Sequence, residues 1–410
     1  MQEAGGAVAP GKTGGSAVEK DKSRYGLKRA VSGESFLFLG FFFVLFGALG
    51  HRMGLVNMMN TMMNTAYQLL LDTVFYIMGI AVIAGAVAGL LSEFGVVALV
   101  NKVLSPLMKP LYGLPGASVV GVLATYLSDN PAILTLANDK GFRRYFKKYQ
   151  LPALTNIGTA FGMGMIITTF MIGLKAPAGE NFIKAALVGN LGAVIGSVVS
   201  VRIMLHFTKR QFGTEQEAGS GEAGGEVAPL GNYRVTREGS VGGRALEAMM
   251  DGGKTGVDMG LAIIPGVLVI CTLVLMLTNG AGAGGAYTGA AYEGIGLLPW
   301  IGEKLSFVLT PLFGFTSAEG IAVPVTALGA AGAAIGLVPK LVASGGALGN
   351  DIAVFTAMCM CWSGYLSTHV AMMGSLGFRQ LTGKAILAHT AGGLCAGVAA
   401  HWLYVLFTAF

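Results

Sequence analysis

The sequence predicts an all-α polytopic membrane protein made of two inverted repeats, as its composition and a repeated block indicate. Only 12% of the 410 residues are charged, about half of the roughly 25% typical of a soluble domain. Apolar residues make up 53% and the mean hydropathy is +0.66, as expected of a chain that faces lipid. The net charge of +6 then reflects the Lys and Arg excess of cytoplasmic loops rather than nucleic-acid binding.

Charge and hydropathy divide the chain into five parts. A polar, Gly-rich tail (1–34) precedes one extra transmembrane helix (35–58). Residues 65–206 and 255–410 form the two repeats, and a polar linker (207–254) joins them. The first apolar stretch of this chain begins only after the tail, whereas the apolar region of a cleavable signal peptide begins closer to the N-terminus. The tail is therefore expected to be disordered and cytoplasmic, and the first helix to be retained.

Uncharged stretches locate the spans, because a transmembrane helix needs about 20 apolar residues. Seven stretches are predicted to cross the membrane: 35–55, 73–92, 150–175, 184–202, 259–278, 351–378 and 385–410. The four cysteines lie in apolar stretches, so a disulfide framework is not expected.

The stretch 116–138 is long enough to cross the membrane but carries Ser-Asp-Asn-Pro in its middle. Pro131 disfavours helix at the preceding residue, and Asp129 is costly at the bilayer centre. Lysines and arginines flank both ends, so both ends are expected on the cytoplasmic side. The stretch is therefore predicted to be a re-entrant hairpin with its tip at Ser128–Pro131.

Residues 104–127 match residues 305–328 at a constant offset of 201, with nine identities in 24 positions. The identities include a Pro-Leu-aromatic-Gly block, in which the aromatic residue is Tyr112 or Phe313. Each copy is predicted to hold an amphipathic helix, a re-entrant hairpin and discontinuous helices. An odd number of predicted spans separates the copies, so they are inverted. Inverted repeats with discontinuous hairpins at mid-membrane are typical of secondary transporters.

The KPLYGLPG and TPLFG blocks, the hairpins after them and the asparagine-bearing helices resemble the nucleoside recognition (Gate) domain. This domain occurs in bacterial membrane proteins of the YjiH type, spore maturation proteins A and B, ferrous iron transport protein B and concentrative nucleoside transporters. The resemblance covers 65–206 and 255–408 and implies a concentrative-nucleoside-transporter-like core. Those transporters carry Gln-Thr-Glu in the first hairpin and a later Glu, where this chain has Ser-Asp-Asn-Pro and a Gly-Ala run. The resemblance therefore leaves the substrate open.

The candidate solute site consists of polar residues predicted at the hairpins and in the broken helices. Its members are Ser128, Asp129, Asn130, Thr155, Asn156, Thr159, Asn350, Asp351, Ser363, Ser367, Thr368 and His369. Polar groups at membrane depth are costly unless they face protein or water. The alternatives are a surface turn at 129–130, helix caps at 350–351 and interhelical packing at 155–159.

Three further features carry weaker predictions. His369 is expected to bind solute or carry a proton, or else to be fixed between helices. Asp72 and Asp258 take similar places in the two repeats and are equally consistent with interfacial anchors. Cys359 and Cys361 suggest a soft metal, but they lie about 200° apart on a helix, so no metal site is predicted.

These patterns predict a secondary active transporter of a small polar solute, nucleoside-like solutes included, bound between the two hairpins at mid-membrane. The alternatives are a non-transporting membrane scaffold and a divalent-metal permease. The chain has no nucleotide-binding GxxxxGK[ST] loop and no hydrolase motif, so an enzyme is not expected. The expected partners are membrane lipids, the solute and further copies of the chain in a dimer or trimer, without nucleic acid. No cofactor is expected beyond a coupling cation, H⁺ or Na⁺. The expected location is the bacterial inner membrane, with a cytoplasmic N-terminus.

Overall fold

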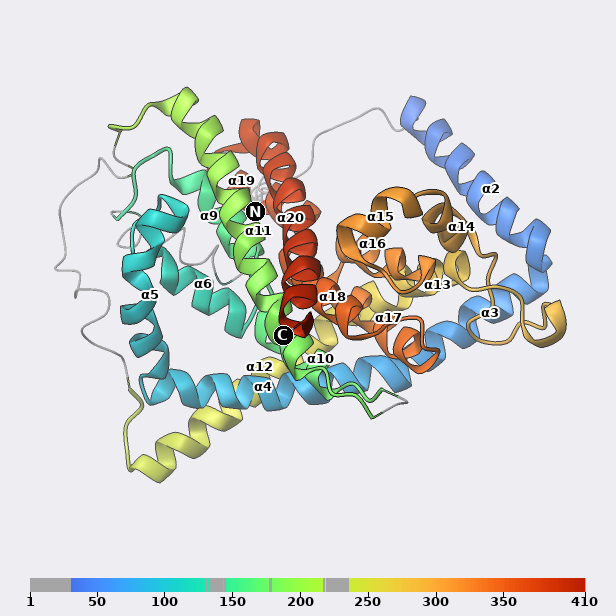
Figure 1. Cartoon of the computed structure of the whole chain (residues 1–410), viewed down its shortest axis with the longest axis horizontal. Coiled ribbons are helices and arrows are strands. Elements are labelled where there is room, and N and C mark those ends of the chain that lie inside the picture. The colour runs from blue at the N-terminus through green and yellow to red at the C-terminus, as the bar shows by residue number, and fades with distance from the viewer. Residues whose placement is uncertain are drawn as a thin grey trace, which may run out of the picture.

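The computed structural model describes residues 31–129, 132, 143, 145–176, 179–216, 218 and 236–409. These residues form helices joined by turns and loops (Figure 1). The first part holds α2 (Gly33–Met53), α3 (Leu55–Gln68), the π-helical segment η1 (Leu69–Val74), α4 (Phe75–Glu93), α5 (Val96–Tyr112), α6 (Ser118–Leu127), α9 (Leu151–Thr159), α10 (Gly164–Gly173) and α11 (Ile183–Phe212).

The second part repeats this order. It holds α12 (Val241–Pro265), the π-helical segment η2 (Gly266–Cys271), α13 (Thr272–Thr278), η3 (Ala283–Gly285), α14 (Leu297–Lys304), α15 (Ser306–Phe313), η4 (Ala318–Ile321), α16 (Ala322–Ala327), α17 (Ala331–Ala343), α18 (Gly349–Cys361), α19 (Tyr365–Ser375), η5 (Arg379–Leu381) and α20 (Thr382–Ala409).

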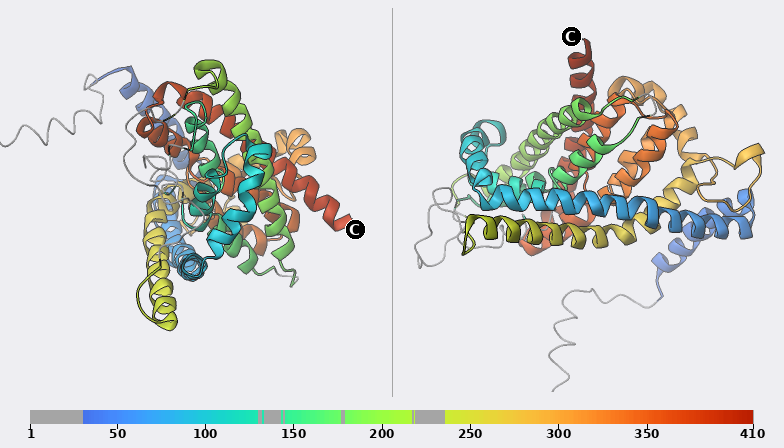
Figure 2. Two further views of the ribbon diagram at one scale, coloured as in Figure 1. Left: turned by 90° about the vertical axis from the view of Figure 1, so that its left-hand side faces the viewer. Right: turned by 90° about the horizontal axis from the view of Figure 1, so that it is seen from below.

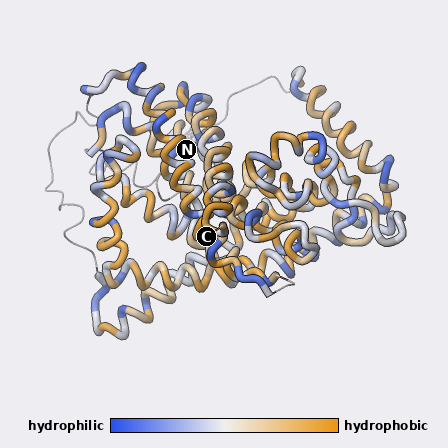
Figure 3. The backbone as a smooth tube through the Cα atoms, in the orientation of Figure 1, coloured by the Kyte–Doolittle hydropathy of each residue, from blue (hydrophilic) through white to orange (hydrophobic). Residues whose placement is uncertain are grey.

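Six helical runs in the described part of the chain are long and apolar enough to span a membrane: 33–53, 55–93, 151–173, 183–212, 241–278 and 379–409. The bent pair formed by α15 and residues 318–327 makes a seventh candidate, with a 79° bend. Apolar residues follow most of each long helix, and polar residues gather near helix ends and in loops (Figure 3). The prediction of a multi-span membrane protein is confirmed.

The predicted span 351–378 is a discontinuous helix, as predicted for the second repeat. The chain turns between α18 and α19, where Gly364 has a φ of 60°. This left-handed conformation cannot continue a right-handed helix. The predicted span 150–175 is likewise interrupted between α9 and α10, where Met163 has a φ of 53°.

The two long helical runs of the repeats, α3–η1–α4 and α12–η2–α13, lie side by side (Figure 2). A Cβ atom on Gly85 would lie 2.2 Å from the Gly252 carbonyl oxygen, and one on Gly89 would lie 2.2 Å from the Ala248 carbonyl oxygen. Only glycine allows the backbones to approach so closely. Because the residue number rises on one helix as it falls on the other, the two helices are antiparallel.

The last helices of the repeats, α11 and α20, form a second antiparallel pair, which crosses the middle of Figure 1. Here a Cβ atom on Gly192 would meet the Ala396 carbonyl oxygen at 2.7 Å, and one on Gly196 would meet the Gly392 carbonyl oxygen at 2.4 Å. Equivalent helices of the two repeats therefore run in opposite directions, as the inverted repeat predicts.

The offset of 201 positions reappears in the backbone. α5 and α15 end at glycines with left-handed φ, Gly113 at 71° and Gly314 at 61°. The breaks of the two discontinuous helices, at Met163 and Gly364, are also 201 positions apart. The repeat found in the sequence is thus a repeat of backbone conformation.

Both helices next to the predicted linker reach into the range 207–254, since α11 continues to Phe212 and α12 starts at Val241. An ion cluster anchors the start of α12 to the end of α4. Glu93, only 3% exposed, lies 2.9 Å from the guanidinium groups of both Arg237 and Arg244.

Candidate functional site

A cavity of about 500 Å³ lies where the interrupted helices of both repeats meet. We call it the first cavity. Asp129 reaches it from the end of the first hairpin helix, and Met163 from the break between α9 and α10. Gly329 and Ala330, between α16 and α17, and Ser363, between α18 and α19, complete its walls. The full lining is Asp129, Met163, Met259, Ala262, Ile263, Gly266, Gly329, Ala330, Ala331, Gly332, Ser363, Gly364, Ser367, Thr368, Ala371 and Met372.

The two breaks of the second repeat are fastened to each other. The Gly364 N–H donates to the Ala327 carbonyl over 3.2 Å, and a Cβ atom on Gly364 would lie 3.2 Å from the Gly329 carbonyl oxygen. Glycine therefore allows the α18–α19 break to lie against the second hairpin. Helix ends leave backbone N–H and C=O groups without intrahelical partners, so the breaks supply polar backbone to this cavity.

Among the described lining residues, Asp129 is the one charged side chain. Ser363, Ser367 and Thr368 add hydroxyl groups, and Met163 and Met372 add flexible apolar surface. Such a set can bind hydroxyl, amide or ammonium groups of a solute, and it gives no side-chain cation for an anion. Ser128, next to Asp129, bonds the Ala124 carbonyl at 2.7 Å and ends the helix, whereas Asn130 lies outside the described residues.

Thr155, Asn156 and Thr159 are fully buried in α9, away from the first cavity. The Thr159 hydroxyl donates to the Thr155 carbonyl over 2.7 Å. The Asn156 amide donates to Ser200 Oγ (2.9 Å) and to the Ala385 carbonyl (3.0 Å). These bonds join α9 to α11 and α20, which is the packing alternative drawn from the sequence.

Asn350 and Asp351 act as caps. The Asn350 amide donates to the carbonyls of Phe313 (2.9 Å) and Gly314 (2.8 Å) at the end of α15. Asp351 accepts from the backbone N–H groups of Thr316 (2.9 Å) and Leu348 (3.0 Å).

The first repeat has a cap equivalent to Asn350. The Gln150 amide donates to the Gly113 carbonyl over 3.0 Å at the end of α5. Gln150 and Asn350 each stand at the start of a broken helix and bind the glycine that ends the amphipathic helix. A side-chain amide thus ties these two elements together in both repeats.

His369 is fully buried and does not line the first cavity. Its Nδ1 bonds the Tyr365 carbonyl at 3.0 Å, and its ring lies 4.6 Å from that of His389, centre to centre. Its Nε2 has no hydrogen-bond partner among the described residues. The geometry fits a histidine held between helices, and the role of proton carrier stays a prediction.

The site residues predicted from the sequence do not include His389. This residue extends the network of hydrogen bonds that begins at Asn156. Asn156 donates to Ser200, and the Ser200 hydroxyl bonds His389 Nδ1 at 3.0 Å. His389 Nε2 then faces the Cys361 carbonyl. A sequence signal exists, because Ser200 and His389 each stand within an apolar span. The cavity residues of α12, such as Met259 and Ala262, carry no such signal.

A search of solved structures finds a similar fold in CNTnw, a bacterial concentrative nucleoside transporter. Its inward-facing, substrate-bound structure matches with a TM-score of 0.50 and 14% identity, over 91% of this chain and 85% of that chain. A variant in an outward-facing state gives the same values. An intermediate state matches with a TM-score of 0.50 and 17% identity, over 81% and 76% of the two chains.

The chain has a CNT-like transporter fold. The predicted fold class is thereby confirmed. Scans against protein-family models and against curated protein sequences find no match. At this level of identity the likeness establishes the CNT-like fold alone, and the resemblance to YjiH-type Gate proteins stays a prediction.

Proposed function

We propose that this chain is a secondary transporter that binds a small polar solute in the first cavity. The observation that carries the proposal is the meeting of the interrupted helices of both inverted repeats around one cavity that contains a carboxylate. Secondary transporters place substrate at such breaks, because unwound backbone provides hydrogen-bonding groups inside the membrane. The CNT-like fold supports the same assignment.

Within this proposal Asp129, Ser363, Ser367 and Thr368 contact the solute, and the other predicted site residues hold the helices in place. A volume of about 500 Å³ suits a small molecule. Because Asp129 is the one charged group among the described lining residues, the proposed solute carries no net negative charge and has several hydrogen-bonding groups. Nucleoside-like solutes meet these conditions.

Transport against a gradient requires a coupling cation, and we propose H⁺ or Na⁺ bound at Asp129. A carboxylate with nearby backbone carbonyls suits either ion, since hard cations take oxygen ligands. We further propose a dimer or trimer in the bacterial inner membrane with a cytoplasmic N-terminus. The Lys and Arg residues of the N-terminal tail and of 140–148 support this orientation.

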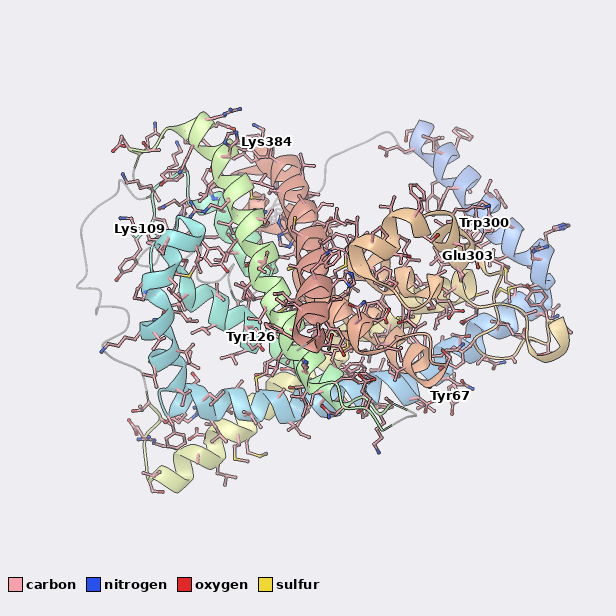
Figure 4. All side chains as sticks on the ribbon, viewed as in Figure 1. Tyr67, Lys109, Tyr126, Trp300, Glu303 and Lys384 are labelled. Carbon is pink, nitrogen blue, oxygen red and sulfur yellow. The ribbon has the colours of Figure 1, made fainter. Side chains whose placement is uncertain are left out.

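Uptake by the full chain in proteoliposomes tests the proposal. Radiolabelled nucleosides and amino acids would be offered under an imposed proton or sodium gradient. Asp129→Asn should reduce uptake at least about tenfold, because a charged hydrogen bond contributes about 1.5–3 kcal/mol. Glu303→Gln is the matched control, since Glu303 is an exposed carboxylate on α14 (Figure 4) outside the cavity. Gradient-independent uptake, or full uptake by Asp129→Asn, would contradict the proposal, and the absence of any uptake by the wild type would favour the scaffold alternative.

A further inference from the structure

A second cavity, of about 620 Å³, lies further along α17 than the first cavity. Ala331 and Gly332, at the start of α17, line the first cavity, whereas Gly336 and Lys340 line the second. Between the two, α17 packs on η2, where the Cys271 thiol donates to the Ala333 carbonyl over 2.8 Å. One helix of the second hairpin therefore borders both cavities. The second cavity is lined by Leu69, Asp72, Thr73, Tyr76, Phe170, Gly173, Leu174, Lys175, Leu275, Tyr292, Gly336, Leu337, Pro339, Lys340 and Val342.

Each cavity contains one residue with an unusual backbone conformation. Among the described residues other than glycine, positive φ occurs at Met163 (53°) in the first cavity and at Tyr292 (66°) in the second. A left-handed conformation is unfavourable for a bulky residue and persists only where the surroundings hold it. Such strain is concentrated at functional sites.

The loop around Tyr292 is rigidly held. The Tyr292 N–H donates to Thr65 Oγ1 on α3 over 2.8 Å. The next residue, Glu293, is 3% exposed and accepts hydrogen bonds from the N–H groups of Thr288 and Gly289, both at 3.0 Å. The loop therefore fixes the Tyr292 ring in the cavity wall, where Lys340 Nζ lies 4.5 Å from the ring centre.

Three charged side chains from three elements line the second cavity. They are Asp72 of η1, Lys175 after α10 and Lys340 of α17. None of them forms an ion pair with another described residue. One carboxylate and two ammonium groups around a cavity of this size match a small molecule that carries both charges.

We propose that the second cavity is a second solute site, which selects zwitterions of amino-acid size. The solute carboxylate lies at Lys175 and Lys340, its ammonium group lies at Asp72, and its apolar part lies on Tyr292. This inference rests on the proposed transport function, and it names the solute class that the first cavity alone does not define. The described lining of the first cavity contains a carboxylate and no ammonium group, so this cavity binds the positive end of the same solute.

Charged thiol reagents test the charge of each cavity without any knowledge of the solute. Thr73→Cys would report on the second cavity and Ser367→Cys on the first, in the full chain with Cys395→Ser. The other three cysteines are buried. The labelling rates with anionic sulfonatoethyl and cationic trimethylammonioethyl methanethiosulfonate would be measured at each cysteine. Each rate would be divided by the rate of the same reagent with a free thiol in solution, which removes the difference in intrinsic reactivity. The anionic reagent should be favoured at Thr73→Cys and the cationic reagent at Ser367→Cys, each by about tenfold.

Adding Lys340→Gln and Lys175→Gln should abolish the preference at Thr73→Cys and leave that at Ser367→Cys unchanged. Equal normalised rates in the two cavities, or a preference that survives loss of both lysines, would overturn the charge assignment.

Protection by added compounds tests the solute class. An equimolar mixture of alanine, serine and threonine should slow labelling of Thr73→Cys, whereas the corresponding amides and N-acetyl derivatives should slow it at least about threefold less. Asp72→Asn should abolish the protection. Equal protection by the amides would overturn the zwitterion class. Uptake that is lost on substitution of Asp129 but unchanged on substitution of Lys340 and Asp72 would overturn this inference alone. Protection of Thr73→Cys from labelling without any uptake would overturn the proposed function alone.

Discussion

Each of the two broken helices has a glycine beside a bulky residue at its break, but the order of the two residues is reversed. In the first repeat Met163 takes the left-handed conformation and Gly164 follows it; in the second repeat Gly364 takes it and Tyr365 follows. A left-handed methionine costs about 1–2 kcal/mol that glycine does not. The first break must therefore be held by contacts from outside the helix, whereas the second forms by the freedom of its own backbone.

Those outside contacts come from the first hairpin. A Cβ atom on Gly164 would lie 2.2 Å from the Tyr126 ring, and the Tyr126 hydroxyl donates to Asn190 Oδ1 on α11 over 3.0 Å. Figure 4 labels Tyr126 at the end of α6, beside α11. The first break is thus coupled to its hairpin through a side chain, and the second through its backbone.

Gly164→Ala should produce the largest change and test this coupling. Its Cβ atom meets the Tyr126 ring, and overpacking of this kind costs about 3 kcal/mol of the free energy of unfolding. Thermal denaturation in detergent would measure it. Combined with Tyr126→Ala, the same substitution should cost little more than Tyr126→Ala alone. Additive losses in the double variant would show that the two residues are not coupled.

Asn350→Ala should cost about 2 kcal/mol and Gln150→Ala about 1 kcal/mol, because buried carbonyls lose their partners. Asn350 bonds two carbonyls and also His401, at 2.8 Å, whereas Gln150 bonds one carbonyl at the equivalent end. The KM for uptake should not change in either variant. A raised KM in Asn350→Ala but not in Gln150→Ala would indicate that Asn350 contributes to solute binding.

Gly364→Ala should cost about 1.5 kcal/mol of the free energy of unfolding, from the left-handed backbone and from the Gly329 carbonyl 3.2 Å away. Gly377, at a φ of 81° with open space around it, is the matched control for the backbone cost alone. Gly364→Ala should therefore destabilise more than Gly377→Ala and should also weaken solute binding, because Gly364 lines the first cavity. Identical effects of the two substitutions would remove the contact between the breaks.

The smallest effect concerns a loop that only the second repeat contains. α4 and α5 are separated by two residues, whereas residues 279–296 join α13 to α14. Burial alone would raise the pKa of Glu293 in this loop, but hydrogen bonds from Thr288, Gly289 and Thr61 lower it overall. A lowered folded pKa stabilises the protein above the unfolded value of about 4.3, and this contribution disappears as the pH falls through the folded pKa.

Thermal denaturation between about pH 3 and 6 would measure the contribution of Glu293. The wild type should be more stable than Glu293→Gln near pH 6, and the two curves should converge at acid pH. Curves that stay parallel would show that the carboxylate does not anchor the loop.

Much of the fold could be predicted because it depends on local properties of the chain. Apolar length located the spans, and the Pro-Leu-aromatic-Gly block located two equivalent helix ends at Gly113 and Gly314. The break at Met163 could not be predicted in this way. Methionine favours helix, and the packing beside this break, such as that of Tyr126 against Gly164, involves residues far apart in the sequence.

The site shows the same division. The sequence by itself determined that polar groups stand within apolar spans, because burying them in lipid is costly whatever the fold. It could not decide which of them meet: Asp129, Ser363 and Thr368 line the first cavity, while Asn156 and His369 face other helices. Which face of a helix borders a cavity depends on how the two repeats pack together. That packing depends on close glycine contacts between residues far apart in the sequence, and so only the tertiary structure decided it.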